Sequence, residues 1–355
     1  MHIAEYMSAN GHEQFAVWTD PAVGLKAFIA IHDTTLGPAL GGTRIWPHKT
    51  EEDAILDVLR LAKAMTYKSA AAGLPLGGGK GLIIADPRKD KTEALFRSYG
   101  RFVNTLGGRY IATEDVGATA RDVEWMSYET RHLVGLPREL GGSGNPAVVT
   151  GFGLHQAMRA CARAVWGSDS LAGKRVAMQG FGNVANSLSE HLLKAGAKLV
   201  VTDISEEARR RARAMAGVEV VESPDDIFDV ECDVFAPCAL GGVLNERTIP
   251  RLKCPIVCGG ANNQLAEAVD AERLQQRNIL YAPDYIVNAG GVINVYYELG
   301  RPYNAEAAMA TAARIHDTME RVIAMSKQRG ITTAHAADLL AEERLSAARR
   351  VRVVR

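Results

Sequence analysis

Two kinds of hydrophobic pattern share the first 150 residues. Apolar and polar positions alternate, with many β-branched residues, at 14–20 (QFAVWTD) and 25–33 (LKAFIAIHD), which predicts strands. Over 50–73 the apolar residues recur at helical spacing, and Thr50 with Asp53 offers a capping box. The remaining elements predicted in this half are strands at 80–86 and 109–115 and a helix at 92–107. We therefore expect a mixed α/β domain here.

The second half alternates more regularly. A loop over 135–151, rich in Gly and Pro, separates the halves and is predicted to be a hinge. The elements expected after it are strands at 174–180, 198–203, 232–238 and 254–260, helices at 183–196 and 205–217, and two closing helical stretches at roughly 304–327 and 333–350. Strands that alternate with helices of this length predict a parallel, doubly wound sheet.

A glycine motif stands where such a sheet binds a dinucleotide. GFGNVA follows one predicted strand and opens the next helix, so Gly180 would form the turn, Gly182 would admit a pyrophosphate and Ala185 would allow close helix packing. Asp203 ends the next strand, where a carboxylate binds ribose hydroxyls and repels a 2′-phosphate. The motif predicts NAD over NADP, although the arginines at 209–211 could soften this preference. A plain tight turn is the alternative.

The stretch GLPLGGGKG, residues 73–81, permits three interpretations. It could be a phosphate cradle, a turn, or a platform that presents the amine of Lys80. Because Gly81 follows Lys80, the spacing G-x-x-x-x-G-K-[ST] of a phosphate-binding loop is missing. With the dinucleotide motif already placed elsewhere, the amine platform is favoured.

Other polar residues near the ends of predicted elements suit amino-acid redox chemistry. Such chemistry needs a fixed cation for the α-carboxylate, an amine that acts as a base and a carboxyl that moves protons. Lys68, Lys80 and the Glu114–Asp115 pair are candidates for these roles, although each lysine alone is more commonly a solvated surface charge. Burial and a neighbouring Lys68 would favour the neutral, basic form of the Lys80 amine.

Composition excludes several other classes. Lys+Arg and Asp+Glu balance at 41 each, so no net field points to nucleic acid or a membrane. The N-terminus lacks a signal-peptide core, and no apolar run has the length of a membrane span. Five cysteines without a CxxC pair predict free thiols in the cytoplasm, and the scattered histidines predict no metal. The basic tail at 344–355 is expected to be a solvated helix.

Eight motifs together resemble one family. GGTR, MTYKSAAAGLPLGGGKG, EDVG, SGNPAVVTGFG, GFGNVA, APCALGG, GGANNQL and APDYIVNAGGVINV follow the order and spacing of the glutamate/leucine/phenylalanine/valine dehydrogenases. The resemblance covers about 13–350 and is closest to the leucine branch. It implies a substrate and oligomerisation domain of 1–149 plus about 328–355, an NAD-binding Rossmann domain of 150–327, and a cleft between them. It also implies a homo-oligomer, either a dimer or an octamer.

The resemblance assigns roles residue by residue. Lys80 and Asp115 match the catalytic pair, and Lys68 matches the residue that binds the substrate carboxylate, helped by the backbone at Gly41 and Gly42. Asn288 matches a polar residue near the reacting carbon. The cofactor-binding set would comprise Thr150, Gly180, Phe181, Gly182, Asn183, Val184, Ala185, Asn186, Asp203, Cys238, Ala239 and Asn262.

Two apolar positions indicate the substrate class. Glutamate-specific relatives hold the distal carboxylate with a lysine and a serine at the positions of Leu40 and Val295. Together with Val292 and Thr113, these residues favour a branched aliphatic side chain, since a carboxylate there would be unpaired. We therefore expect oxidative deamination of L-leucine, and also of isoleucine and valine, to 2-oxo acids and ammonia. Phenylalanine dehydrogenase is the alternative within the family, and a non-catalytic NAD-binding regulatory protein is the alternative from another class.

Overall fold

The chain forms two compact units in the computed structural model, which describes residues 2–300 and 302–353. Unit 1 comprises Met1–Asn145, Val295–Ala305 and Ala341–Arg355, and unit 2 comprises Pro146–Asn294 and Glu306–Leu340. The ends of the predicted first domain, residues 1 and 354–355, lie outside the described residues. The functional domain bounds drawn from the sequence stay a prediction.

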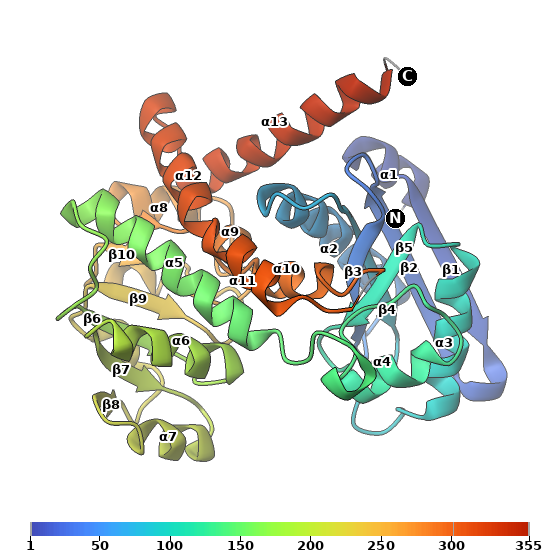
Figure 1. Ribbon diagram of the computed structural model, residues 1–355, viewed down its shortest axis with the longest axis horizontal. Coiled ribbons are helices and arrows are strands. Elements are labelled where there is room, and N and C mark those ends of the chain that lie inside the picture. The colour runs from blue at the N-terminus through green and yellow to red at the C-terminus, as the bar shows by residue number, and fades with distance from the viewer. Residues whose placement is uncertain (1, 301, 354–355) are drawn as a thin grey trace. The chain divides into compact units, whose positions relative to one another are not determined.

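Unit 1 is built on a five-stranded sheet in the order β1-β2-β4-β3-β5 (Figure 1). The β1–β2 and β2–β4 pairs are antiparallel, whereas β3 runs parallel to both β4 and β5. Its strands are β1 (Gln14–Asp20), β2 (Leu25–Asp33), β3 (Ala39–Ile45), β4 (Gly77–Ile83) and β5 (Tyr110–Glu114). Its N-terminal helices are α1 (Ile3–Asn10), α2 (Glu51–Ala71), α3 (Glu93–Thr105) and α4 (Ala120–Ser127). The strands predicted at 14–20 and 25–33 are confirmed.

The glycine run is itself part of a buried strand. The strand predicted at 80–86 instead spans Gly77–Ile83. Its glycines are needed because the structure leaves no room for side chains at these positions. A Cβ on Gly78 would lie 2.1 Å from the Thr66 nitrogen of α2, and a Cβ on Gly81 would lie 1.9 Å from the Tyr99 hydroxyl. The run therefore lets α2 and a buried tyrosine approach the strand that carries Lys80.

Unit 2 contains a six-stranded sheet in the order β11-β10-β9-β6-β7-β8, and its strand pairs are parallel. The predicted doubly wound α/β class is confirmed. The strands are β6 (Arg175–Gln179), β7 (Lys198–Thr202), β8 (Val218–Val220), β9 (Val234–Pro237), β10 (Ile256–Val257) and β11 (Leu280–Tyr281). The helices are α5 (Ala147–Trp166), α6 (Asn183–Lys194), α7 (Glu206–Arg213), α8 (Asp270–Gln276), α9 (Asp284–Val287), α11 (Ala305–Ala313) and α12 (Ile315–Arg329), and α10 (Gly290–Tyr296) starts here. Helices α5, α6 and α12 pack side by side (Figure 1).

The predicted hinge loop is wrong over 147–151, which form the first turns of α5. Pro146 occupies the N-cap position, and the Thr150 hydroxyl donates to its carbonyl oxygen at 2.9 Å. Proline is tolerated at a helix start because the N–H that it lacks would have no partner inside the helix. The Gly- and Pro-rich composition of this stretch therefore marked a helix start as well as a loop.

The basic tail is helical but not wholly solvated. Helix α13 (Thr333–Val353) ends in unit 1, where Arg344 donates to the carbonyl oxygens of Ala70, Gly73 and Leu74 at 2.9, 2.7 and 3.0 Å. These carbonyls lie between the end of α2 and the start of β4. The tail thus stabilises the connection that joins Lys68 to Lys80.

Candidate active site

Lys80 and Asp115 come together as the sequence predicts. Lys80 lies on β4 and Asp115 directly after β5, and β3 separates these two strands in the sheet. The Lys80 residue is 5% exposed, and its Nζ lies 2.7 Å from Asp115 Oδ2. At this distance a proton can pass between the amine and the carboxylate, which is what an acid–base pair requires.

Arg44 is a third charged member that the predicted site set does not contain. Its Nε lies 3.1 Å from the same Oδ2 atom of Asp115. Arg44 stands two residues after Gly42 on β3, so both residues face the same side of the sheet. A Cβ on Gly42 would lie 2.6 Å from the Cβ of Asp115, so glycine at 42 makes room for the carboxylate. Period-two spacing along this strand would have found Arg44, had the strand been predicted.

The electrostatics of the pair favour an ionised aspartate. Burial raises the pKa of Asp115, but the charges and hydrogen bonds of Lys80 and Arg44 oppose this, and the pKa lies below that of an ordinary aspartate. The neighbouring Glu114 differs: burial, followed by the charges of Asp122 and Asp115, raises its pKa. Asp115 is therefore ready to accept a proton before it donates one.

Lys68 and the glycine pair occupy the elements beside this charge cluster. Lys68 lies in the last turn of α2, and the next residue, Ser69, places its hydroxyl 3.5 Å from the Gly77 carbonyl oxygen on β4. The Gly41 carbonyl oxygen accepts a hydrogen bond of 2.7 Å from the Tyr110 hydroxyl. The predicted substrate-carboxylate residues thus border the strand of Lys80.

The residues predicted to contact the substrate side chain are largely buried. Leu40 is 1% exposed and sits between Gly78 on β4 and Ile111 on β5 in the strand register. Thr113, also on β5, is 9% exposed. Val295 belongs to unit 1 and Val292 to unit 2, and each is 6% exposed. All four positions named from the sequence are therefore nearly inaccessible to solvent.

The fold itself requires glycine at only one of the two motif positions of unit 2. Gly180 has φ +94°, and a Cβ there would lie 2.8 Å from the Cβ of Ala239, so this turn requires glycine. Gly182 is exposed, and a Cβ built on it would meet nothing within 4 Å. The open space above Gly182 fits a pyrophosphate, because the fold gives no other reason for glycine at this position.

The rest of the motif has the geometry of a phosphate site. Helix α6 begins at Asn183 with no side-chain cap, so its N–H groups and positive dipole end are available to an anion. Ala185 is 1% exposed, and Val184 and Asn186 lie in the same first turns. The buried Phe181 donates its backbone N–H to Asp203 Oδ2 at 2.7 Å, which brings the predicted ribose carboxylate to the motif.

Two of the three arginines at 209–211 pair with carboxylates. Arg209 pairs with Glu206 at 2.6 Å and also donates to the Asp203 carbonyl oxygen. Arg211 pairs with Glu207 at 3.2 Å. Their positive charges are therefore partly neutralised within α7.

The pair formed by Asn262 and Asn288 in unit 2 contains a buried hydrogen-bond acceptor without a partner among the described residues. Asn288 is 4% exposed and donates through Nδ2 to Asn262 Oδ1 at 2.8 Å. The Oδ1 atom of Asn288 has no hydrogen-bond partner among the described residues. Buried amide oxygens are normally paired, so this one fits a ligand that carries an N–H donor. Thr150 of α5 packs against the start of α10, since a Cβ on Gly290 would lie 2.5 Å from the Thr150 Cα.

Cys238 and Ala239 follow β9 at the same end of the sheet as the glycine motif. The Cys238 backbone N–H donates to the Gln179 carbonyl oxygen at 2.7 Å, just before Gly180. Burial raises the pKa of the Cys238 thiol to about 11. The thiol therefore stays protonated near neutral pH and acts as a packing group beside the motif.

Comparison with known proteins decides the family. The description "Glu/Leu/Phe/Val dehydrogenase, dimerisation domain" matches residues 12–132, and "Glutamate/Leucine/Phenylalanine/Valine dehydrogenase" matches residues 141–206 and 200–352. The chain belongs to the Glu/Leu/Phe/Val dehydrogenase family. The family resemblance read from the motifs is thereby confirmed.

Relatives within this family cover nearly the whole chain. A leucine dehydrogenase of Geobacillus stearothermophilus is 53% identical over 352 residues, which span 99% of this chain and 95% of that protein. A phenylalanine dehydrogenase of Caldalkalibacillus thermarum is 48% identical over 94% of this chain and 91% of its own length. The crystal structure of L-tryptophan dehydrogenase from Nostoc punctiforme has a TM-score of 0.85 and 42% identity, and the match covers 98% of this chain and 99% of that one.

Family membership fixes the reaction class. The Glu/Leu/Phe/Val dehydrogenases are NAD(P)-dependent, and this chain is an amino-acid dehydrogenase. The open position above Gly182 and the uncapped start of α6 fit such a dinucleotide.

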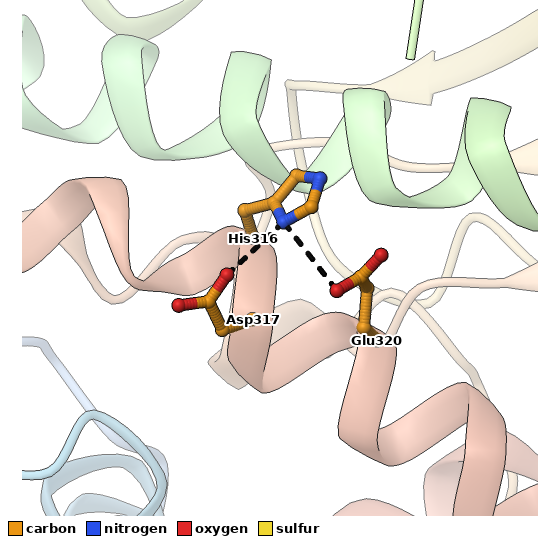
Figure 2. Close-up of side chains that lie close together, drawn as sticks. All are labelled: His316, Asp317 and Glu320. Carbon is orange, nitrogen blue, oxygen red and sulfur yellow. Dashed lines mark hydrogen bonds and ion pairs between the residues drawn. The ribbon is translucent and has the colours of Figure 1, made fainter. Parts of the chain in front are cut away.

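One group of possible metal ligands lies apart from these residues. His316, Asp317 and Glu320 converge on α12, with His316 Nδ1 3.2 Å from Asp317 Oδ1 and 3.8 Å from Glu320 Oε2 (Figure 2). Arg163 pairs with Glu320 at 3.2 Å, so ordinary ion pairs account for this group. The predicted absence of a metal stays a prediction.

Among the described helices of this dehydrogenase, none is both long and apolar enough to cross a membrane.

Proposed function

We propose that the chain catalyses the NAD-dependent oxidative deamination of apolar L-amino acids, L-leucine foremost, to 2-oxo acids and ammonia. The observation that carries this proposal is the Lys80–Asp115 pair at 2.7 Å, in the unit that also holds Leu40. The leucine dehydrogenase that is 53% identical over 99% of this chain supports leucine as the substrate.

The proton steps follow from the charges of the pair. Asp115 is ionised, so it takes a proton from the substrate ammonium and leaves a neutral amine. A bound nicotinamide supplies the acceptor for the hydride that then leaves Cα. Lys68 holds the α-carboxylate as a fixed cation, which keeps the reacting carbon in place.

Hydrolysis of the resulting iminium uses the same two side chains. With Asp115 protonated, Lys80 first releases its proton to solvent and becomes a neutral amine. Water then adds to the former Cα while the neutral Lys80 Nζ takes one of its protons, and a carbinolamine forms. Asp115 returns its proton to the nitrogen, the C–N bond breaks, and the hydroxyl proton passes to the departing ammonia as the carbonyl forms. Each turnover yields one 2-oxo acid, one ammonium ion and one further proton, which Lys80 passes to solvent.

A direct assay tests the proposal. Purified protein given L-leucine and NAD⁺ should produce a rise in absorbance at 340 nm, whereas D-leucine should produce none. If no apolar L-amino acid gives this rise although NAD⁺ binds, the chain would instead be a non-catalytic NAD-binding regulatory protein.

The glycine motif supplies a matched pair of variants. Gly182→Ala should leave the free energy of unfolding within about 0.5 kcal/mol of wild type, since its Cβ would meet nothing within 4 Å. NAD⁺ affinity should nevertheless fall about tenfold or more, because the methyl group occupies the pyrophosphate position. Gly180→Ala should instead destabilise the fold by about 1–2 kcal/mol or more, given its φ of +94°. Unchanged NAD⁺ binding by Gly182→Ala, measured by calorimetry, would contradict the site.

Asp203 is expected to make NAD⁺ the preferred cofactor. A 2′-phosphate would face this carboxylate, and like charges placed together cost several kcal/mol, so kcat/KM for NAD⁺ should exceed that for NADP⁺ at least about 10²-fold. Arg209 and Arg211 pair with the carboxylates of Glu206 and Glu207, so these two cations are less available to a 2′-phosphate. This pairing supports the expectation. Steady-state rates with both cofactors measure the ratio, and equal values would mean that the arginines dominate.

The same proposal includes assembly and location. A dimerisation-domain description matches residues 12–132, which supports a homo-oligomer that assembles through unit 1. All five cysteines are free thiols, which supports a reducing compartment such as the cytoplasm.

A further inference from the structure

Both cations that pair with the Asp115 carboxylate contact the same oxygen atom. Lys80 Nζ and Arg44 Nε both contact the Oδ2 atom, at 2.7 and 3.1 Å. Neither contact involves Oδ1. Two cations on one oxygen make the two oxygens unequal, although a free aspartate side chain can exchange them by a rotation about χ2.

Arg44 is itself fixed by a second carboxylate. Its Nη1 lies 3.3 Å from Asp57 Oδ1 and 3.0 Å from Asp57 Oδ2, while its Nε is turned toward Asp115. Asp57 lies on α2 and also faces His48, whose Nε2 is 3.4 Å from Asp57 Oδ2. The guanidinium therefore bridges a carboxylate on a helix to the carboxylate that follows β5.

We propose that Arg44 is a positioning residue for the oxidative deamination: anchored by Asp57, it holds Asp115 by Oδ2 so that Oδ1 is presented to the substrate amino group. The inference rests on the proposed function, since it assigns Asp115 the proton transfers to nitrogen. Lys80 cannot do this alone, because a flexible ammonium defines no plane, whereas the planar guanidinium does. Arg44 also keeps its contact when Lys80 turns to the attacking water.

The charges around Asp115 set the expected pH dependence. Lys80 faces it from β4 and Arg44 from β3, and its own strand contributes Glu114 and Tyr110. Burial raises the pKa of Asp115 and both cations lower it, so removal of Arg44 should raise it. Because the reaction starts with an ionised Asp115, the acid limb of the kcat profile should then move to higher pH.

The test compares three variants with wild type, using L-leucine and NAD⁺. Arg44→Met should lower kcat about 10-fold to 10²-fold with a smaller change in KM, and should move the acid limb upward by about one pH unit. Arg44→Lys keeps the charge, so its acid limb should stay near that of wild type while kcat falls by less. Arg97→Met is the matched control, because it removes another Arg–carboxylate contact of unit 1, with Glu129 at 2.8 Å, and should change neither quantity.

The outcomes separate this inference from the proposed function. A wild-type protein that does not oxidise any apolar L-amino acid overturns both. An active wild type with an unchanged kcat and acid limb in Arg44→Met overturns only the role of Arg44. If Arg44→Met loses its unfolding transition, Arg44→Lys decides, since a wild-type kcat in that variant contradicts a requirement for the planar guanidinium. A fall in kcat without movement of the acid limb in Arg44→Met would indicate a purely structural role and would also overturn the inference.

Discussion

Lys80→Ala is expected to lower kcat with L-leucine by about 10²-fold to 10⁴-fold, the range that a positioned acid–base group contributes. The variant lacks the amine that takes a proton from water. Of the two cations that pair with Asp115 Oδ2, it retains Arg44. NAD⁺ affinity should stay near that of wild type, because the glycine motif belongs to unit 2. Steady-state kinetics and NAD⁺ titration measure the two quantities.

Lys91→Ala is the matched control for this variant. Lys91 also pairs with a largely buried aspartate of unit 1, Asp122, yet it has no assigned role in the reaction. It should lose some stability and retain turnover. Turnover by Lys80→Ala similar to that of Lys91→Ala would remove Lys80 from the mechanism.

The second large effect concerns the substrate: kcat/KM for L-leucine should exceed that for L-glutamate by at least about 10³-fold. The family resemblance predicts that Leu40 and Val295 occupy the positions at which glutamate-specific relatives hold a second carboxylate, and neither side chain can pair with a charge. An ionised group left unpaired there costs several kcal/mol, and every 1.4 kcal/mol corresponds to a factor of about ten. A panel of L-amino acids at fixed NAD⁺ measures the ratio.

Two further substrates separate charge from size. L-Methionine has about the length of glutamate without its charge, so it should react far better than glutamate. L-Phenylalanine should fall below leucine by a smaller factor, since a ring poses a steric problem only, and Leu40→Ala or Val292→Ala should narrow that gap. A wild-type preference for phenylalanine would favour the phenylalanine dehydrogenase alternative instead.

Locally determined features were predictable from the sequence. Strand β1 alternates over its second half and β2 is a nearly continuous apolar, buried run, while α2 begins where Thr50 accepts a hydrogen bond from the Asp53 N–H at 3.1 Å. The motif at Gly180 requires a turn that its own residues encode. In each case the signal is carried by a short run of neighbouring residues in the sequence.

Features that depend on distant contacts were not predictable. Strand β3 and the first residues of β4 are rich in glycine, which disfavours strands by itself. The structure leaves no room for side chains there: a Cβ on Gly41 or Gly42 of β3 would meet β4 or Asp115, and a Cβ on the glycines of β4 would meet neighbours that include α2 and buried tyrosines. Arg44 stands in the GGTR motif but was given no role, since its value as a site residue depends on Asp115, 71 positions away in the chain. The roles assigned to these residues remain predictions for the experiments above.

The most direct measurement is the product balance of the wild-type protein with L-leucine and NAD⁺. Oxidative deamination predicts equal amounts of NADH, ammonium and the 2-oxo acid at every time point, with NADH followed at 340 nm and the other two products quantified separately. Failure to form NADH, or NADH formed without an equal amount of ammonium, would contradict the proposed reaction.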